Sequence, residues 1–164
     1  MTWTSFEEGL ATELGALDDR VVVTVSWSTT PTVYVQLEQT ATQLLARSGA
    51  DDVLPVEQRL GPERRARLET AGWVPPEVDP QSRGTWTLAV PWPARSADHD
   101  RLAAACRTVL RDVHQVPSPA ELEYRAWRHP EPDPVGVTFH PEDLEPGDPH
   151  LVLPALGITD AQAA

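Results

Sequence analysis

The chain has 164 residues, of which 40% are hydrophobic, and a formal net charge of −12 at pH 7. This length suits one domain with a substantial core, and no apolar run is long enough to span a membrane. The acidic balance opposes binding to nucleic acid or to an anionic membrane. The single cysteine, Cys106, excludes an intramolecular disulfide and a thiolate zinc site. Since the N-terminus lacks the basic and apolar regions of a secretion signal, we expect a soluble, cytoplasmic protein.

Residues 5–17 have the pattern of an amphipathic helix. Ser5 and Glu8 form a capping box, which predicts that the helix begins there. Apolar residues then recur at helical spacing, namely Phe6, Leu10, Leu14 and Leu17. This stripe predicts one buried face.

Two β-branched stretches, residues 20–28 and 32–40, alternate apolar and polar side chains. The apolar set comprises Val21, Val23, Val25 and Trp27 in the first stretch and Val33, Val35 and Leu37 in the second. Residues 29–31 form a short loop between them, so the pattern predicts an antiparallel hairpin. Residues 42–48 indicate a third short strand that ends near Gly49.

The next helix is predicted from Pro62 to about Ala71, with Gly72 at its C-cap. A strand follows over residues 86–92, in which every second residue is large and apolar. Ser96 is expected to cap a longer helix that Pro117 stops.

Residues 118–127 fit two different structures. Ser118 and Glu121 make a second capping box, which predicts a helix. Leu122, Tyr124 and Ala126 alternate with polar residues, which favours a strand instead.

The predicted elements describe an α+β domain over residues 1–128, with one antiparallel sheet and helices packed on it. Their order is helix, strand, strand, a third strand that the pattern allows, helix, strand and helix. Residues 129–164 hold seven of the 17 prolines and no basic residue other than histidine. We expect an acidic, loosely structured tail, in which the apolar residues 150–158 could dock on the domain.

Motifs that mark catalytic sites are missing from the sequence. The nine glycines form no phosphate loop or dinucleotide pattern, and there is no nucleophile elbow. Cys106 falls on the apolar face of its predicted helix, so we interpret it as a core residue rather than a nucleophile. His114 falls in the last turn of the same helix, where the helix dipole favours a protonated ring. We expect no catalysis and no cofactor.

The histidines of the tail offer one alternative with chemistry. Together with nearby acids they could ligate a divalent metal, the candidate ligands being His129, His140, His150, Asp133, Glu142 and Asp148. Their spacing matches no known ligand pattern, and proline-rich loops seldom preorganise a site. We interpret them as solvated side chains, which leaves a metal-dependent enzyme as a distant third hypothesis.

Six tryptophans are the most distinctive residues that remain. Their large amphipathic side chains suit a surface that binds without fixed polar complementarity. Trp27, Trp73 and Trp86 are predicted to lie in the core. Trp3 and Trp92 stand at the ends of predicted elements and are expected to be partly exposed.

Three segments resemble one known family. They are "LGPERRARLETAGWVPP" at 60–76, "TWTLAVPWP" at 85–93 and "LAAACRTVLRDVHQVPSPAEL" at 102–122. Over residues 6–122 the chain resembles the type III secretion chaperone-like proteins, including the YbjN-like (TY-Chap type) proteins of actinobacteria. The resemblance implies a binding module that holds a partner peptide or protein on a sheet and its helices, without nucleotide. It implies no catalytic residues.

The first functional hypothesis is a nucleotide-independent chaperone or adaptor that binds a peptide or protein client, by pairing at a sheet edge or by packing in a groove. The candidate contacts are aromatic, namely Trp3, Tyr34, Trp86, Trp92 and Trp127. The alternative is an immunity-type or structural protein that binds one specific, basic partner. Neither nucleic acid nor a membrane is an expected partner, and the sequence leaves room for a homodimer.

Overall fold

The computed structural model of the protein describes residues 1–78, 82–133, 140, 142 and 144–163. Within these residues the chain forms a sheet in the order β4-β3-β2-β1-β5-β6, antiparallel throughout except between β5 and β6. The elements are α1 (Trp3–Ala16), β1 (Val21–Trp27), β2 (Thr30–Gln39), β3 (Gln43–Gly49), α2 (Pro62–Thr70), β4 (Thr85–Pro91), α3 (Ser96–Arg107), β5 (Leu122–Arg128) and β6 (Thr159–Asp160). The predicted α+β class and the first hairpin are confirmed.

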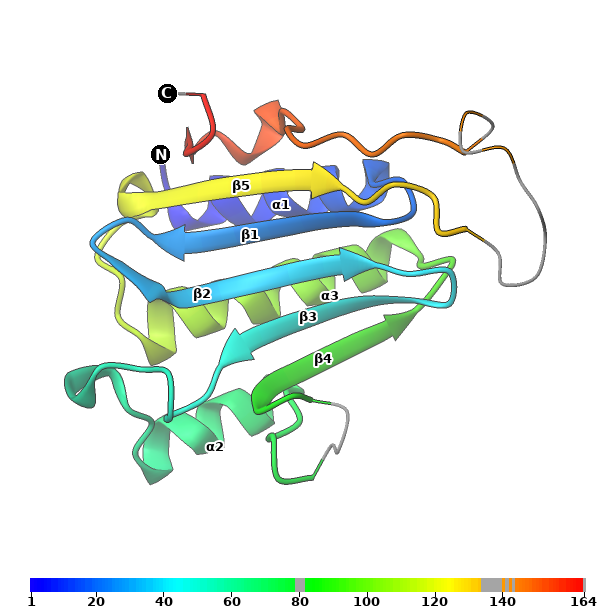
Figure 1. Ribbon diagram of the computed structural model, residues 1–164. Helices are drawn as coiled ribbons and strands as arrows, with labels where there is room; N and C mark the ends of the chain where they lie inside the picture. Colours follow the sequence, from blue (N-terminus) through cyan, green and yellow to red (C-terminus); the bar gives the residue numbers. More distant parts are fainter. Residues whose placement is uncertain (79–81, 134–139, 141, 143, 164) are drawn as a thin grey trace.

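The helices gather on one side of the sheet. Helices α1 and α3 lie behind the strands in Figure 1, and α2 lies near β3 and β4. The opposite face of the sheet, which points toward the viewer, carries no helix from the described part of the chain. None of the helices in that part is long and apolar enough to cross a membrane.

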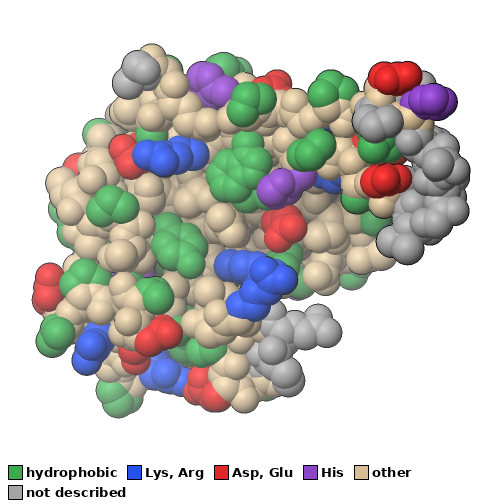
Figure 2. All heavy atoms as spheres, viewed as in Figure 1, with side chains coloured by type: hydrophobic (Ala, Val, Ile, Leu, Met, Phe, Trp, Pro, Cys, Tyr) green, Lys and Arg blue, Asp and Glu red, His purple; other side chains and the backbone are tan. Residues whose placement is uncertain are grey.

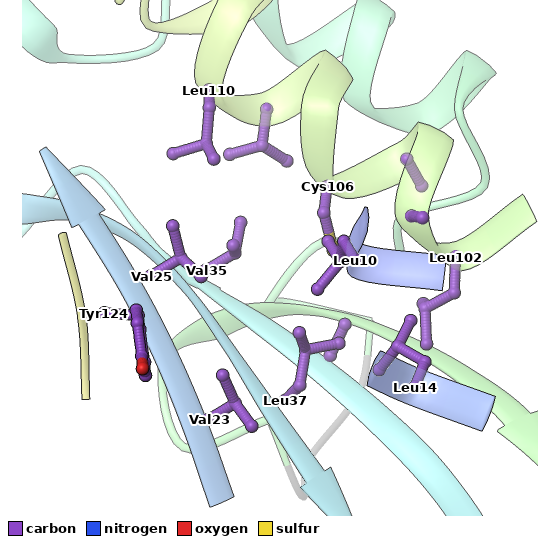
Figure 3. Packing of buried hydrophobic residues seen from close by; sticks show 14 of the residues in the cluster. Leu10, Leu14, Val23, Val25, Val35, Leu37, Leu102, Cys106, Leu110 and Tyr124 are labelled. Atoms are coloured by element: carbon purple, nitrogen blue, oxygen red, sulfur yellow. The ribbon is translucent and has the colours of Figure 1, made fainter. Parts of the chain in front are cut away.

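The strand register decides which side chains face α1 and α3. Val23 pairs with Leu37 of β2 and with Ala126 of β5, and all three side chains are buried. Successive side chains of a strand point to opposite faces, so the residues between them point away from the helices. Figure 3 shows Leu10 of α1 and Leu102 of α3 lying over this side of the sheet. The core therefore lies between the helices and one sheet face.

Helix α1 begins earlier than predicted, because its N-cap is Thr2 rather than Ser5. Thr2 Oγ1 accepts a hydrogen bond from the Ser5 N–H at 3.1 Å, and the Ser5 hydroxyl accepts one from the Thr2 N–H at 2.9 Å. Ser5 thus completes the capping box from inside the helix. The predicted apolar stripe from Phe6 to Leu17 is buried, as expected.

The ends of the other helices differ little from the prediction. Helix α3 has Arg95 rather than Ser96 as its N-cap, and the Arg95 N–H donates to the Asp98 carboxylate at 3.1 Å. The helix continues as a π-helical turn over Thr108–Val113. After α2, Gly72 adopts a φ of 93°, a left-handed backbone that glycine allows at a helix end.

Of the two structures considered for residues 118–127, the strand is right. Ser118 caps only the single turn Pro119–Glu121, by accepting a hydrogen bond from the Ala120 N–H at 3.2 Å. The chain then enters β5, which pairs with β1 along its whole length. Pairing and burial of the alternating apolar side chains outweigh the local capping signal.

The tail is not loose where the structure describes it. Residues 144–163, which we call the C-terminal segment, run beside β5 (Figure 1). Leu153 and Leu156 of this segment are buried in the main core. The docking of residues 150–158 is therefore confirmed, and the expectation of a loose structure is wrong for this segment. Residues 134–139, 141, 143 and 164 of the tail lie outside the described residues.

Candidate interaction surface

The sheet face turned away from α1 and α3, which we call the open face, carries side chains from five strands. The register arranges them in three cross-strand rows: Trp127, Val22, Glu38, Leu45 and Ala89; then Arg125, Thr24, Gln36, Arg47 and Thr87; then Glu123, Ser26 and Tyr34. Figure 2 is viewed onto this face and shows hydrophobic side chains beside basic, acidic and histidine side chains. The face is therefore mixed in chemistry rather than uniformly acidic.

A shallow pocket of about 350 Å³ opens on the open face. Its lining comes mainly from β1, β2 and β5 and consists of Thr24, Ser26, Pro31, Tyr34, Gln36, Glu123 and Arg125. The Gln36 amide donates a hydrogen bond to the Thr24 hydroxyl at 3.0 Å, which joins β1 and β2 across the pocket. The pocket thus offers an aromatic ring, a guanidinium group and a carboxylate to one ligand.

Two of the five predicted contact residues, Tyr34 and Trp127, lie on the open face. Both side chains are partly exposed. The Trp127 ring meets the His129 ring edge-on, with centroids 6.2 Å apart. Desolvation raises the pKa of Tyr34 above its ordinary value, and its protonated hydroxyl can donate a hydrogen bond.

Arg47 and Arg125 lie in the middle row of the open face. In the described part of the chain neither has a carboxylate within ion-pair distance, and Arg47 Nη1 is buried without a hydrogen-bond partner. Guanidinium groups of this kind can bind carboxylates through two parallel hydrogen bonds. Our reading of the sequence missed both residues. The available signal was that each arginine lies between the core-facing residues of its strand, so alternation places it on the opposite face.

Trp86 is a predicted contact that the structure places in the core instead. Its side chain is 0% exposed, and the Arg65 guanidinium lies 5.2 Å from the centre of the ring. A fully covered side chain presents no surface to a client, so the role of Trp86 is in stability. Trp73 is buried as predicted, whereas Trp27 is only partly buried and donates its indole N–H to Glu121 at 3.0 Å.

Trp3 and Trp92 are partly exposed, as predicted, but they belong to the helix side of the sheet. Trp3 packs edge-on against Phe6 of the same helix, with centroids 5.8 Å apart. Trp92 lies beside His99 of α3, with centroids 6.4 Å apart. The structure therefore does not bring the five predicted contacts together in one site.

Cys106 and His114 are both buried. Burial raises the pKa of the Cys106 thiol to about 12, which suits a core residue and not a nucleophile. Burial, aided by the charge of Arg64, lowers the pKa of His114 to about 4. The expected effect of the helix dipole on His114 is therefore outweighed by desolvation. Among the residues that the structure describes, no three His, Cys, Asp or Glu side chains stand together to hold a metal ion.

Helices α1, α2 and α3 packed on one side of a mostly antiparallel sheet place this fold in the type III secretion chaperone-like class. The chain belongs to the TY-Chap3 family, described as T3SS (YopN, CesT) and YbjN peptide-binding chaperone 3, which matches residues 1–128. The resemblance seen in the sequence is thus confirmed. No curated protein and no solved structure matches the chain significantly. The family match ends with the last residue of β5, so the C-terminal segment lies beyond it.

Proposed function

We propose that the protein is a non-catalytic cytoplasmic chaperone or adaptor that binds peptide segments of client proteins on its open face, without nucleotide. The observation that carries this proposal is the combination of partly exposed Tyr34 and Trp127 with Arg47 and Arg125 on one sheet face, where the described part of the chain places neither an ion-pair partner for the two arginines nor a helix. The family description as a peptide-binding chaperone supports it.

The edges of the sheet favour packing on this face over pairing at an edge. At β4, Val74 and Thr87 exchange backbone hydrogen bonds at 2.7 and 3.0 Å, and the Thr85 N–H donates to Ser82. Pro91 has no N–H to offer. The other outer strand, β5, is covered by the C-terminal segment. An incoming strand therefore finds no long run of free backbone groups in the described conformation.

The rows of the open face suggest which client it suits. Apolar side chains of a peptide can pack on the partly exposed ring of Trp127, which lies beside the buried Val22 in the same row. A client carboxylate can accept hydrogen bonds from Arg125 or Arg47 in the next row. The preferred client segment thus combines apolar and acidic side chains, although the protein as a whole is acidic.

An array of short peptides of varied sequence tests the proposal. The double variant Tyr34→Ala/Trp127→Ala is compared with the native chain and with Val56→Ala, whose exposed side chain lies outside the three rows. We expect the double variant to lose roughly 10- to 100-fold in peptide affinity, as removal of central aromatic contacts does in other interfaces.

The array also distinguishes a general chaperone from a protein that binds one specific partner. Capture of many unrelated peptides is expected for a chaperone, and capture of one sequence alone would favour the immunity-type alternative. If the native chain and the double variant bound the peptides equally well, the open face would not be the binding site.

A further inference from the structure

The outer edge of β5 is occupied by the chain itself. Arg128 and Asp148 exchange backbone hydrogen bonds at 2.7 and 3.0 Å. The Leu151 N–H donates to the Ala126 carbonyl at 2.8 Å. The C-terminal segment therefore begins its course along β5 as an added strand would.

The same edge is covered at its other end. The Ala161 N–H donates to the Tyr124 carbonyl at 2.9 Å, and β6 pairs with β5 in parallel. Between these points the Ala126 N–H donates to the side-chain oxygen of Gln162 at 2.8 Å. The backbone groups that β5 presents outward are thus satisfied by the C-terminal segment.

Two leucines anchor the segment in a groove between α1 and β5. Leu156 is 0% exposed and Leu153 is 7% exposed. The Leu153 N–H donates to the Tyr124 hydroxyl at 3.1 Å, and the Ala155 N–H donates to the Glu13 carboxylate of α1 at 2.6 Å. The groove therefore binds a chain through its backbone and through two apolar side chains spaced three residues apart.

The receiving surface is shaped for a close backbone. A Cβ atom at Gly9 of α1 would stand 2.0 Å from the Ala155 carbonyl oxygen, so the groove exists at this depth only because residue 9 is glycine. Gly9, Glu13 and Tyr124 belong to the part of the chain that the family matches, whereas the occupant of the groove lies beyond it. The receiving surface therefore belongs to the part of the chain that the family matches, and its occupant does not.

We propose that the groove between α1 and β5 is a second peptide-binding site, which the C-terminal segment occupies in cis as a built-in competitor. Its ligand is an extended segment of another protein with two leucine-like side chains three residues apart. Recognition by strand-edge hydrogen bonds and apolar pockets tolerates many sequences. The proposal rests on the proposed peptide-binding function and extends it, because a tethered competitor lets only strong or abundant clients enter.

A labelled synthetic peptide of residues 148–163, added to the full-length chain and followed by fluorescence anisotropy, tests the groove. Leu156→Ala weakens the docking of the chain's own C-terminal segment in the groove. Binding of the added peptide should therefore tighten roughly 30-fold, which corresponds to the loss of one leucine anchor. Gln162→Ala removes the side-chain hydrogen bonds to the Ala126 N–H and the Pro149 carbonyl without touching the core, and should tighten peptide binding roughly fivefold. Val152→Ala, at a 66% exposed position of the same segment, is the matched control and should change nothing.

Adding Gly9→Ala to Leu156→Ala should abolish the gained affinity, because the new methyl group fills the groove while alanine favours the helix. Absence of a gain in both Leu156→Ala and Gln162→Ala, or a gain that survives Gly9→Ala, would overturn the proposal. The open-face variant Tyr34→Ala/Trp127→Ala should leave the binding of this peptide unchanged, so failure of the groove and failure of the open face are distinguishable.

Discussion

The backbone of Gly9 in α1 touches the backbone of Ala155 in the C-terminal segment, so closely that a Cβ at residue 9 would lie 2.0 Å from the Ala155 carbonyl oxygen. Side chains do not tolerate such a distance, so this contact requires glycine. A helix from the first residues of the chain and a segment from its last residues are therefore fitted to each other.

Gly9→Ala should loosen the C-terminal segment even though alanine favours helices. At Gly15, an exposed position of the same helix, a Cβ meets nothing closer than 3.4 Å, so Gly15→Ala should raise the free energy of unfolding by about 1 kcal/mol. Gly9→Ala should instead lower it by about 1–3 kcal/mol through overpacking. Hydrogen exchange should also become faster at the N–H groups of Leu151 and Ala161. Equal behaviour of the two variants would contradict this account of the contact.

Replacement of Trp86 by alanine should mainly reduce stability, whereas replacement of Trp127 should mainly reduce peptide binding. Trp86→Ala leaves a large cavity in the core and should cost about 3–5 kcal/mol in the free energy of unfolding. Trp127→Ala removes a partly exposed ring and should cost no more than about 1 kcal/mol, while peptide binding falls. Denaturant unfolding and peptide titration of both variants make the comparison. A large stability loss in Trp127→Ala would mean that its ring serves the fold rather than a client.

The arginines of the open face should control the salt dependence of client binding. Arg47→Gln and Arg125→Gln should each weaken binding of an acidic peptide by roughly three- to tenfold, because a charge-assisted hydrogen bond is lost. The slope of affinity against salt concentration should become shallower. Arg111→Gln, an exposed site beyond α3 whose side chain is paired with Asp112, is the control. A slope identical in all four proteins would show that these guanidinium groups do not meet the client.

Acid should destabilise the fold through His114. Its pKa lies at about 4 in the folded chain and at 6.5 when solvated, chiefly because burial disfavours the charged ring. The unfolded chain therefore binds a proton at higher pH than the folded chain, and stability is lost as pH falls from 6.5 toward 4. The expected loss is about 3 kcal/mol, and His114→Gln should remove it from the pH profile of unfolding. His140→Gln, at an exposed position, is the control. An unchanged profile in His114→Gln would be the contrary result.

Elements with a clear local period were predictable from sequence. The strand around Leu37 alternates and the stripe of α1 repeats at helical spacing, because each pattern reflects one buried face. Residues 118–127 were ambiguous because Ser118 caps a real but single turn, and only pairing with β1 decides the rest. The apolar residues 150–158 indicated that the tail could dock, but the groove that receives Leu156 is built by distant residues and could not be located from a local pattern.

The candidate surface was predictable in part. Tyr34 stands between the buried Val33 and Val35, and Trp127 follows the buried Ala126, so alternation places both on the face opposite the core. The same rule, applied to Trp86 with Leu88 and Val90, indicates a core strand, and selecting Trp86 as a contact was therefore an error. Whether an open-face arginine has an ion-pair partner among the described residues depends on side chains brought together by the fold.

The central claim, that the open face binds the client peptide, is tested most directly by locating a bound peptide. Nuclear magnetic resonance spectra of the isotope-labelled full-length chain are recorded while a peptide selected on the array is added. Saturable shifts should appear at the Trp127 indole and at the backbones of Tyr34 and Arg125, which span the face. Shifts that leave these three residues unchanged while the peptide binds would contradict the claim.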